Sequence, residues 1–139
     1  MLAEEIDFHN LFKIHPTAML LLTADLRIVD ANDVFLAEVG RPLEELVGRN
    51  VYEEFQPGDC AGNPKWTALD EAMTSGRRQC DLLTRYDIED PDRPGVFREH
   101  WFTTLAQPFH GRDGAVQMIE VSMRDITPVI DQYRALCEG

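Results

Sequence analysis

The stretch that decides the fold is IVDANDVFLAEVGRPLEELVGRNVYEEF, residues 28–55. Its first two residues end a strand, and either Asp30 or Asn32 can accept the free backbone N–H groups of a helix that begins near Asp33. Gly40 ends this helix, because glycine adopts the left-handed conformation that commonly follows a last helical turn without a steric penalty. A strand that leads directly into a short helix is therefore predicted.

A second short helix follows at once. Pro42 suits its first turn, since the proline ring already holds a helical φ and the missing N–H is not needed there. Glu44 and Glu45 favour the positive end of the helix, and Gly48 again reads as a post-helix position. A third helix begins before Phe55, so three helical segments are packed into fewer than thirty residues.

Together with residues near the other end of the chain, this stretch resembles the signature of a PAS domain, the sensory module of many signalling proteins. The matching positions are Asn32, Phe35, Gly40 and residues 46–49 in the first half, and Pro108, residues 113–114 and residues 124–127 in the second. The resemblance covers roughly residues 11–127, nearly the whole chain. Residues 85–88, Pro91 and residues 99–102 are further similar to PAS domains that precede sensor histidine kinases and related phosphatases.

The charge balance excludes some classes of partner. The chain has 139 residues, the size of one domain, and 25 acidic against 13 basic residues give a net charge of −12. Such a chain repels a phosphate backbone instead of releasing its counterions, so no nucleic acid is expected to bind. Contact of this segment with an anionic membrane surface is not expected for the same reason.

Cysteine usage and the N-terminus indicate the compartment. Cys60, Cys80 and Cys137 are odd in number and unrelated in spacing, unlike the even framework of a small secreted domain. The N-terminus has no basic region followed by an apolar run, so it is not a signal peptide, and the longest apolar run, residues 18–22, is too short to span a bilayer. We expect a reducing, cytoplasmic location.

The remaining elements follow from periodicity. Residues 18–23 and 27–31 form the first hairpin, and residues 56–64 are a loop rich in glycine and proline. Trp66, Leu69 and Met73 stand at helical spacing in a helix ended by residues 75–76. Alternation returns in residues 80–88, with Cys80, Leu82, Thr84, Tyr86 and Ile88 on one face, and continues in residues 97–107 and 115–126.

Strands joined by hairpins pair antiparallel, and a single layer of amphipathic helices suits one face of a sheet, so the fold class is α+β. The PAS resemblance implies a five-stranded antiparallel sheet in the order 2-1-5-4-3, with short helices on one face. We expect an N-terminal flanking helix in residues 1–15, the PAS domain in residues 16–127, and an exit helix in residues 128–139.

Both flanking helices carry apolar stripes. The N-terminal stripe, with Phe8 and Leu11, packs either on the domain's own sheet or, as the resemblance implies, against a second copy in a homodimer. The exit helix, capped at Thr127 with Pro128 as its first residue, ends the chain with an unburied stripe. We infer a fragment or the sensor end of a longer protein, in which this helix leads to an effector domain.

The resemblance implies a ligand pocket between the helices and the sheet. The candidate lining residues are bulky and mostly apolar: Phe35, Trp66, Met73, Leu82, Tyr86, Trp101, Phe102 and Met118. The sequence leaves open which face of residues 97–107 points inward. It also leaves open a filled interior, in which Trp66, Met73, Tyr86 and Trp101 occupy the space of a ligand.

Metal and cofactor signals are weak. The acidic cluster Asp87, Glu89, Asp90 and Asp92 lacks the spacing of a calcium loop and is interpreted as a solvated loop. The four histidines lack metal-site spacing, and no histidine lies on the helix in residues 65–75, where haem-binding PAS domains keep their axial ligand. Cys60 lacks the neighbours of a photoreactive cysteine. The cofactor is unknown, and neither haem nor a cysteinyl-flavin is expected.

No nucleophile motif or phosphate-binding loop supports catalysis. Glu120 is the only clear candidate for a catalytic carboxylate on an apolar strand, and it is interpreted as solvent-facing. The leading hypothesis is therefore a non-catalytic sensory or relay module that senses a small ligand or partner and biases an attached histidine kinase or phosphatase. Asp125 and Thr127 are expected to couple the last strand to the exit helix, or to form an ordinary helix cap. The alternative is a ligand-free dimerisation and protein-interaction module.

Overall fold

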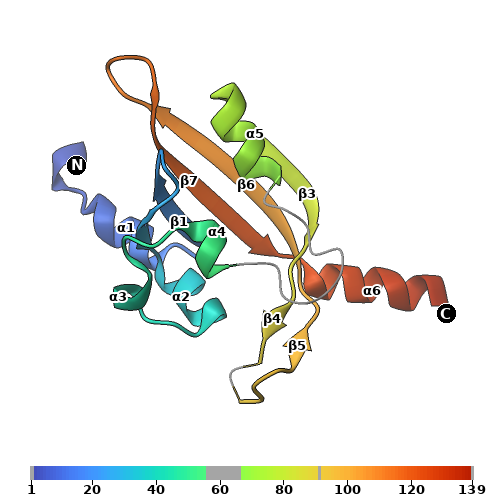
Figure 1. Cartoon of the computed structure of the whole chain (residues 1–139). Helices are drawn as coiled ribbons and strands as arrows, with labels where there is room; N and C mark the ends of the chain where they lie inside the picture. The colour runs from blue at the N-terminus through green and yellow to red at the C-terminus, as the bar shows by residue number, and fades with distance from the viewer. Residues whose placement is uncertain (1, 56–66, 91, 139) are drawn as a thin grey trace.

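The computed structural model describes residues 2–55, 67–90 and 92–138. It is built on a five-stranded antiparallel sheet in the order β2-β1-β7-β6-β3 (Figure 1), which confirms the α+β class and the expected order 2-1-5-4-3. The strands of this sheet are β1 (Ala18–Thr23), β2 (Ile28–Ala31), β3 (Gln79–Arg85), β6 (Trp101–His110) and β7 (Val116–Asp125). A separate two-stranded ribbon is formed by β4 (Ile88–Glu89) and β5 (Phe97–Arg98).

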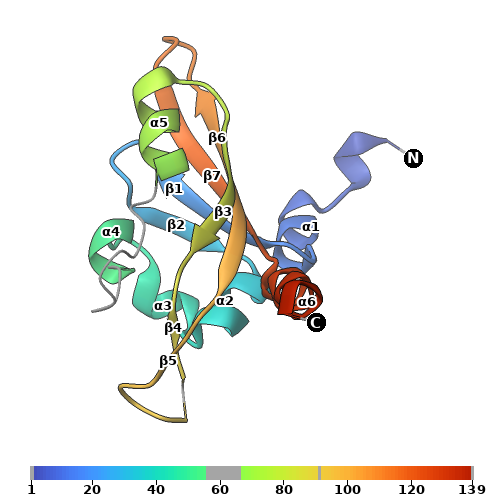
Figure 2. The ribbon, with the colours of Figure 1, turned by 90° about the vertical axis from the view of Figure 1, so that its right-hand side faces the viewer.

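Helices lie on both sides of the sheet. The chain forms η1 (Ala3–Glu5), α1 (Phe8–Ile14), α2 (Asp33–Val39), α3 (Leu43–Leu46), α4 (Val51–Glu54), α5 (Thr67–Ser75) and α6 (Thr127–Glu138). Figure 2 shows α4 and α5 on one side of the sheet and the terminal helices α1 and α6 on the other. We call the first side the inner face and the second the outer face.

The stretch of residues 28–55 folds largely as its helix-capping and helix-ending residues predict. Asn32, not Asp30, is the N-cap of α2, and its side chain accepts the N–H of Phe35. Gly40 ends α2 in the left-handed conformation at φ 65°. Pro42 precedes α3 as its N-cap residue instead of standing in its first turn. Three short helices therefore follow β2, as expected.

Asn32 ties the first strand to the first inner helix. Its side chain is fully buried, and its Oδ1 accepts the N–H groups of Met19 and Phe35 at 2.9 and 3.1 Å. Its Nδ2 donates to the carbonyl of Thr17 at 2.7 Å and to that of His15 at 3.3 Å. Because a buried amide without partners is costly, these contacts hold α2 in one position relative to β1.

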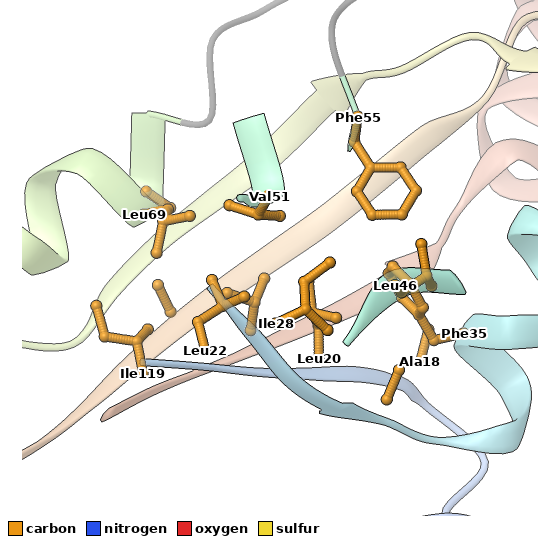
Figure 3. Packing of buried hydrophobic residues seen from close by; sticks show 14 of the residues in the cluster. Ala18, Leu20, Leu22, Ile28, Phe35, Leu46, Val51, Phe55, Leu69 and Ile119 are labelled. Carbon is orange, nitrogen blue, oxygen red and sulfur yellow. The ribbon is translucent and has the colours of Figure 1, made fainter. Parts of the chain in front are cut away.

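The core lies between the inner face and the helices that cover it. Alternate residues of the central strands point inward, so Ala18, Leu20 and Leu22 of β1 are buried opposite Met123, Val121 and Ile119 of β7. Figure 3 shows Leu20, Leu22 and Ile119 facing Val51 and Leu69, which come from α4 and α5. This apolar burial is the main stabilising contribution to the fold.

The third strand departs from simple alternation. Asp81 pairs with Thr104, but Thr84 pairs with Phe102, so three steps along β3 match two along β6. This β-bulge leaves Leu82 and Leu83 exposed, at 73% and 61%. The extra residue moves the inward positions from odd to even numbers, which a strict period of two in residues 80–88 does not predict.

The terminal helices expose their apolar residues. The exposed side chains are Leu2, Phe8, Leu11 and Ile14 near the N-terminus, and Val129, Tyr133 and Leu136 on α6. Neither α1 nor α6 contains a buried residue, so the N-terminal stripe does not pack into the domain's own core. Among the described residues, no helix combines the length and the apolar character needed to cross a membrane.

We expect Asn32→Ala to lower the free energy of unfolding by about 2–4 kcal/mol, because one buried and one partly buried N–H group lose their acceptor and α2 loses its cap. Urea denaturation followed by circular dichroism measures this loss. Asn50→Ala is the matched control: Asn50 caps α4 by accepting from Tyr52 and Glu53, and its removal is expected to cost about 1 kcal/mol. Equal losses in the two variants would contradict the special role of Asn32.

Candidate ligand cavity and its connection to the exit helix

A cavity of about 270 Å³ opens between the inner face of the sheet and the short helices. Phe102 of β6 and Met123 of β7 contribute from the sheet, and Ala68 and Leu69 contribute from α5. The ribbon β4–β5, which extends past the end of the sheet in Figure 1, supplies further wall residues. The cavity is thus bordered by elements from both halves of the chain.

Aromatic rings make up much of its lining. Phe35 of α2 and Phe55, which follows α4, meet edge to face with ring centroids 5.6 Å apart and an interplanar angle of 89°. Tyr86, Phe97 and Phe102 line the cavity as well. Burial raises the pKa of Tyr86 to about 12, so its hydroxyl stays protonated at neutral pH.

The structure places three of the expected pocket residues on the cavity: Phe35, Tyr86 and Phe102. Met73 packs against the core but does not line the cavity. Trp66 lies outside the described residues. Of the side chains that the filled-interior alternative assigns to this space, Met73 packs against the core and Tyr86 lines the cavity.

The remaining three, Leu82, Trp101 and Met118, lie away from the cavity. Leu82 follows Asp81, which lines the cavity, so it points to the opposite, exposed side of β3. Even-numbered residues of β6, such as Phe102 and Thr104, point inward, which leaves Trp101 on the outer face. In β7 the inward positions are odd-numbered, so Met118 is also on the outer face. The structure therefore does not place these three residues in the pocket. Which residues of a strand face inward depends on strand pairing and not on residue type.

Acidic residues surround the cavity, and two of the predicted loop acids are buried. Asp87 and Asp90 are 5% and 7% exposed, which corrects their interpretation as part of a solvated loop. Arg85 donates to Asp87 through Nε at 3.0 Å and Nη2 at 3.2 Å, and Arg98 donates to Asp90 at 2.9 Å. The burial is possible because each carboxylate has an arginine partner.

Glu38 of α2 lines the cavity and is half-buried. Burial, followed by the negative charge of Asp125, raises the pKa of Glu38 to about 7, while the charge of His100 opposes the shift. Glu38 makes no hydrogen bond or ion pair with any residue in the described ranges. Sequence reasoning missed this residue, because the charges that act on it come from Asp125 of β7 and from His100 before β6, far away along the chain.

The joint between β7 and α6 is closed by three hydrogen bonds. Asp125 accepts the N–H of Thr127 at 2.8 Å, and Thr127 Oγ1 accepts the N–H of Trp101 at 2.9 Å. The N–H of Ile126 donates to the carbonyl of Trp101 at 2.8 Å. The two residues expected to couple strand to helix, Asp125 and Thr127, therefore lie together at this joint and attach it to the start of β6.

A second attachment holds α6 farther along the helix. Trp101 Nε1 donates to Glu99 Oε1 at 2.5 Å, and Arg134 Nη1 donates to the same oxygen at 3.0 Å. The Arg134 guanidinium also lies 6.0 Å from the Trp101 ring centroid, within range of a cation–π contact. We call Glu99, Trp101 and Arg134 the helix latch. The 35-residue separation of Glu99 and Arg134 gives no local sequence signal.

Charged contacts connect the cavity wall to this latch. Asp87 lines the cavity and pairs with Arg85, and Arg85 Nη2 lies 3.7 Å from Glu99 Oε2. The hydrogen bond from Trp101, followed by those from Arg134, lowers the pKa of Glu99 and keeps it ionised. The series runs from Asp87 through Arg85 and Glu99 to Arg134 on α6.

Other candidate sites gain little from the structure. Among the described residues, no group of three or more His, Cys, Asp or Glu side chains is placed to hold a metal ion. Cys80 and Cys137 are exposed free thiols, and Cys60 lies outside the described ranges. Glu120 stands on the outer face, where it accepts a hydrogen bond from the Ser122 hydroxyl, so it does not face the cavity.

Comparison with known proteins agrees with this architecture. A family model described as the PAS fold matches residues 15–130. An RNA-binding light-oxygen-voltage receptor superposes with a TM-score of 0.73 at 19% identity, over 94% of this chain but only 36% of the receptor. The PAS domain of nitrogen regulation protein NR(II) from Vibrio parahaemolyticus superposes with a TM-score of 0.66 at 17% identity, over 87% of this chain and 99% of that domain.

A sensory box sensor histidine kinase from Vibrio cholerae superposes with a TM-score of 0.58 at 19% identity, over 89% of this chain and 93% of the solved chain. A search of the curated proteins finds no match. At these identities the likeness to solved structures concerns the fold. The chain spans about a third of the light-oxygen-voltage receptor's length.

We expect the Glu38 carboxyl to titrate with a midpoint of about 7 in a carbon-13 NMR experiment on the folded protein. This pKa lies above that of an unfolded glutamate, about 4.3, so the folded state binds the proton more tightly. The free energy of unfolding should therefore fall as pH rises from about 4.3 to about 7, and level off above that range.

Glu38→Gln should remove this part of the pH dependence, and Glu44→Gln, which changes an exposed residue on α3, should retain it. Denaturation in urea at several pH values measures both variants. A Glu38 midpoint near 4 would show that the carboxyl is not held as the structure indicates.

Proposed function

The chain belongs to the PAS family, and on that premise we propose that it is a sensory and signal-relay module of a bacterial-type signal transduction protein. A small ligand or partner binds at the cavity, and an attached histidine kinase or phosphatase receives the signal through α6. The module itself is not catalytic. Residues 16–127 form the sensory core, and residues 1–15 and 128–139 flank it.

One observation carries this proposal: the cavity and the exit helix share the same pair of strands. Phe102 and Met123 face the cavity from β6 and β7. Trp101, the neighbour of Phe102, donates its backbone N–H to Thr127 at the joint and its ring N–H to Glu99 in the helix latch. Because adjacent residues of a strand point to opposite faces, an occupant that moves Phe102 also moves Trp101.

The charged series supplies a second route. Arg85 lies between two carboxylates, Asp87 at the cavity wall and Glu99 at the latch. An occupant that displaces Asp87 weakens its ion pair with Arg85. Arg85 then competes with Arg134 for the Glu99 carboxylate. The mechanism is a shift between a docked and an undocked state of α6, biased by the difference in ligand affinity for the two states.

Asp125 and Thr127 act as the pivot of this motion. Their hydrogen bonds keep the first turn of α6 attached to β7 and β6 while the rest of the helix changes position. The capping role and the coupling role are compatible, because a helix that moves about one end needs that end to stay intact.

The proposed setting is a reducing cytoplasm. The free, exposed thiols of Cys80 and Cys137 support this setting, since such thiols persist where disulfides are kept reduced. The net charge of −12 supports the proposal that nucleic acid is not a partner.

A second candidate function is ligand-free homodimerisation through the terminal helices. It is supported by the exposed apolar side chains on α1 and α6, among them Phe8 and Ile14 on α1 and Tyr133 and Leu136 on α6. Apolar residues at this exposure on two flanking helices are typical of an interface. The two functions are compatible, but only sensing requires an occupied cavity.

Native mass spectrometry of the purified chain tests the two functions together. For sensing we expect a stoichiometric small-molecule mass that is retained with the protein, and for dimerisation a dimer that Leu136→Glu dissociates because a charge enters an apolar interface. Glu138→Gln on the same helix is the control and should leave the assembly unchanged. A dimer without any bound small molecule would favour the second function over ligand sensing.

We expect Arg134→Ala to increase amide hydrogen exchange in α6 about two- to fivefold, since the contact with Trp101 that holds the helix is lost. Gln132→Ala, an exposed change on the same helix, should leave exchange at the wild-type rate. In a full-length parent protein, Arg134→Ala should shift effector output in one direction, whereas Gln132→Ala should not. Unchanged exchange in both variants would overturn the latch.

A further inference from the structure

The charge balance of the cavity restricts what can bind there. Its described lining residues include five acidic ones and one basic one; the acids are Glu38, Glu54, Asp81, Asp87 and Glu89, and the base is Arg41. Arg41 is already engaged, because its Nη1 donates to Glu54 at 2.9 Å and its Nε to Glu45 at 3.5 Å. A carboxylate or phosphate ligand would therefore meet repulsion without a free basic partner among these residues.

Most of the acidic groups at the cavity already have donors. Glu54 binds Arg41 and Arg49, Asp81 accepts the N–H of Ala68, Asp87 binds Arg85, and Glu89 accepts the N–H of Gly95. Glu38 differs, because no residue in the described ranges donates to it. The unmet acceptor of the cavity is thus a carboxylate, and the group that would satisfy it is a cationic donor.

The rings that line the cavity favour the same class of ligand. Five aromatic residues of the described ranges contribute: Phe35, Phe55, Tyr86, Phe97 and Phe102. Aromatic faces attract organic cations, and they also bury the apolar body of such a molecule. The volume of about 270 Å³ is just below the usual range for drug-sized ligands, about 300–1,000 Å³, so the occupant is small.

We propose that the cavity binds a small organic cation, an alkyl- or arylalkyl-ammonium whose nitrogen lies against the Glu38 carboxylate and whose apolar body lies among the aromatic rings. The inference rests on the proposed function, because it names the class of ligand that the sensory cavity takes. The ligand charge would lie at a carboxyl on which the charge of Asp125, at the joint, acts. Glu38 senses the charge of Asp125, so a cation bound at Glu38 changes the electrostatic environment of the residue that caps α6.

The charged groups that act on Glu38 set the pH dependence of binding. Burial, followed by the charge of Asp125 from β7, raises the pKa of Glu38, and the charge of His100 from the segment before β6 lowers it. Arg41, which follows α2, lines the same cavity but is held by Glu54 and Glu45. Since the cation binds the ionised form of Glu38, binding should strengthen as pH rises through the titration of this carboxyl.

The test uses three probes of similar shape and different charge: phenethylammonium, 2-phenylethanol and 3-phenylpropionate. Each is titrated into the full chain, and chemical-shift changes at Ala68, Leu69 and Met123 report binding in the cavity. We expect the cation to bind about tenfold more tightly than the neutral alcohol, and the anion not to bind. From pH 6 to pH 8 the affinity for the cation should rise severalfold, and that for the alcohol should stay constant.

Glu38→Gln should reduce cation affinity about tenfold, remove its pH dependence and leave alcohol binding unchanged. Glu44→Gln makes the same change in net charge at an exposed site and should bind all three probes as the wild type does. Binding of the alcohol or the anion with equal or higher affinity would overturn the cation inference while leaving the sensory cavity in place. If no probe of any charge shifts the cavity signals, both the inference and the ligand-sensing function fail.

Discussion

The fully buried side-chain amide of Asn32 is the constraint on which the rest of the structure depends. Its oxygen accepts from Met19 in β1 and from Phe35 in α2, and its nitrogen donates to two carbonyls of the segment before β1. Four partners in fixed directions allow one position of α2 on the sheet, because displacement would leave buried polar groups unpaired. That position directs Phe35 and Glu38 toward the cavity.

The two faces of the sheet then carry different kinds of contact. The inner face and the short helices enclose the apolar core and the aromatic cavity, and the outer face carries the charged contacts that hold α6. The β6 strand belongs to both, since Phe102 faces the cavity and Trp101 faces the helix. A displacement on one face is transmitted to the other because the strand alternates and is paired with β7 from Phe102 to His110.

Local signals explain which parts were predictable from sequence. Gly40 and Gly48 adopt positive φ angles, and Asn32 caps α2, since these roles depend on the backbone preferences of single residues. The face of β7 with Ile119 and Val121 was likewise predictable from alternation. The exposure of Leu82 was not, because a bulge whose position is decided by pairing with β6 reverses the parity of β3. The burial of Asp90 was not predictable either, because its partner Arg98 lies on β5, the other strand of the ribbon.

By itself, the sequence determined the order of the elements and the residues that end them, the α+β class and the resemblance to the PAS family. These follow from short-range rules: caps, left-handed glycines, turns and hydrophobic period. Only the tertiary structure decided which residues face the cavity, that the charge of Asp125 acts on Glu38, and that Glu99 and Trp101 hold Arg134. The physical reason is distance along the chain: strand register and cross-sheet charge contacts join residues tens of positions apart, where no local preference connects them.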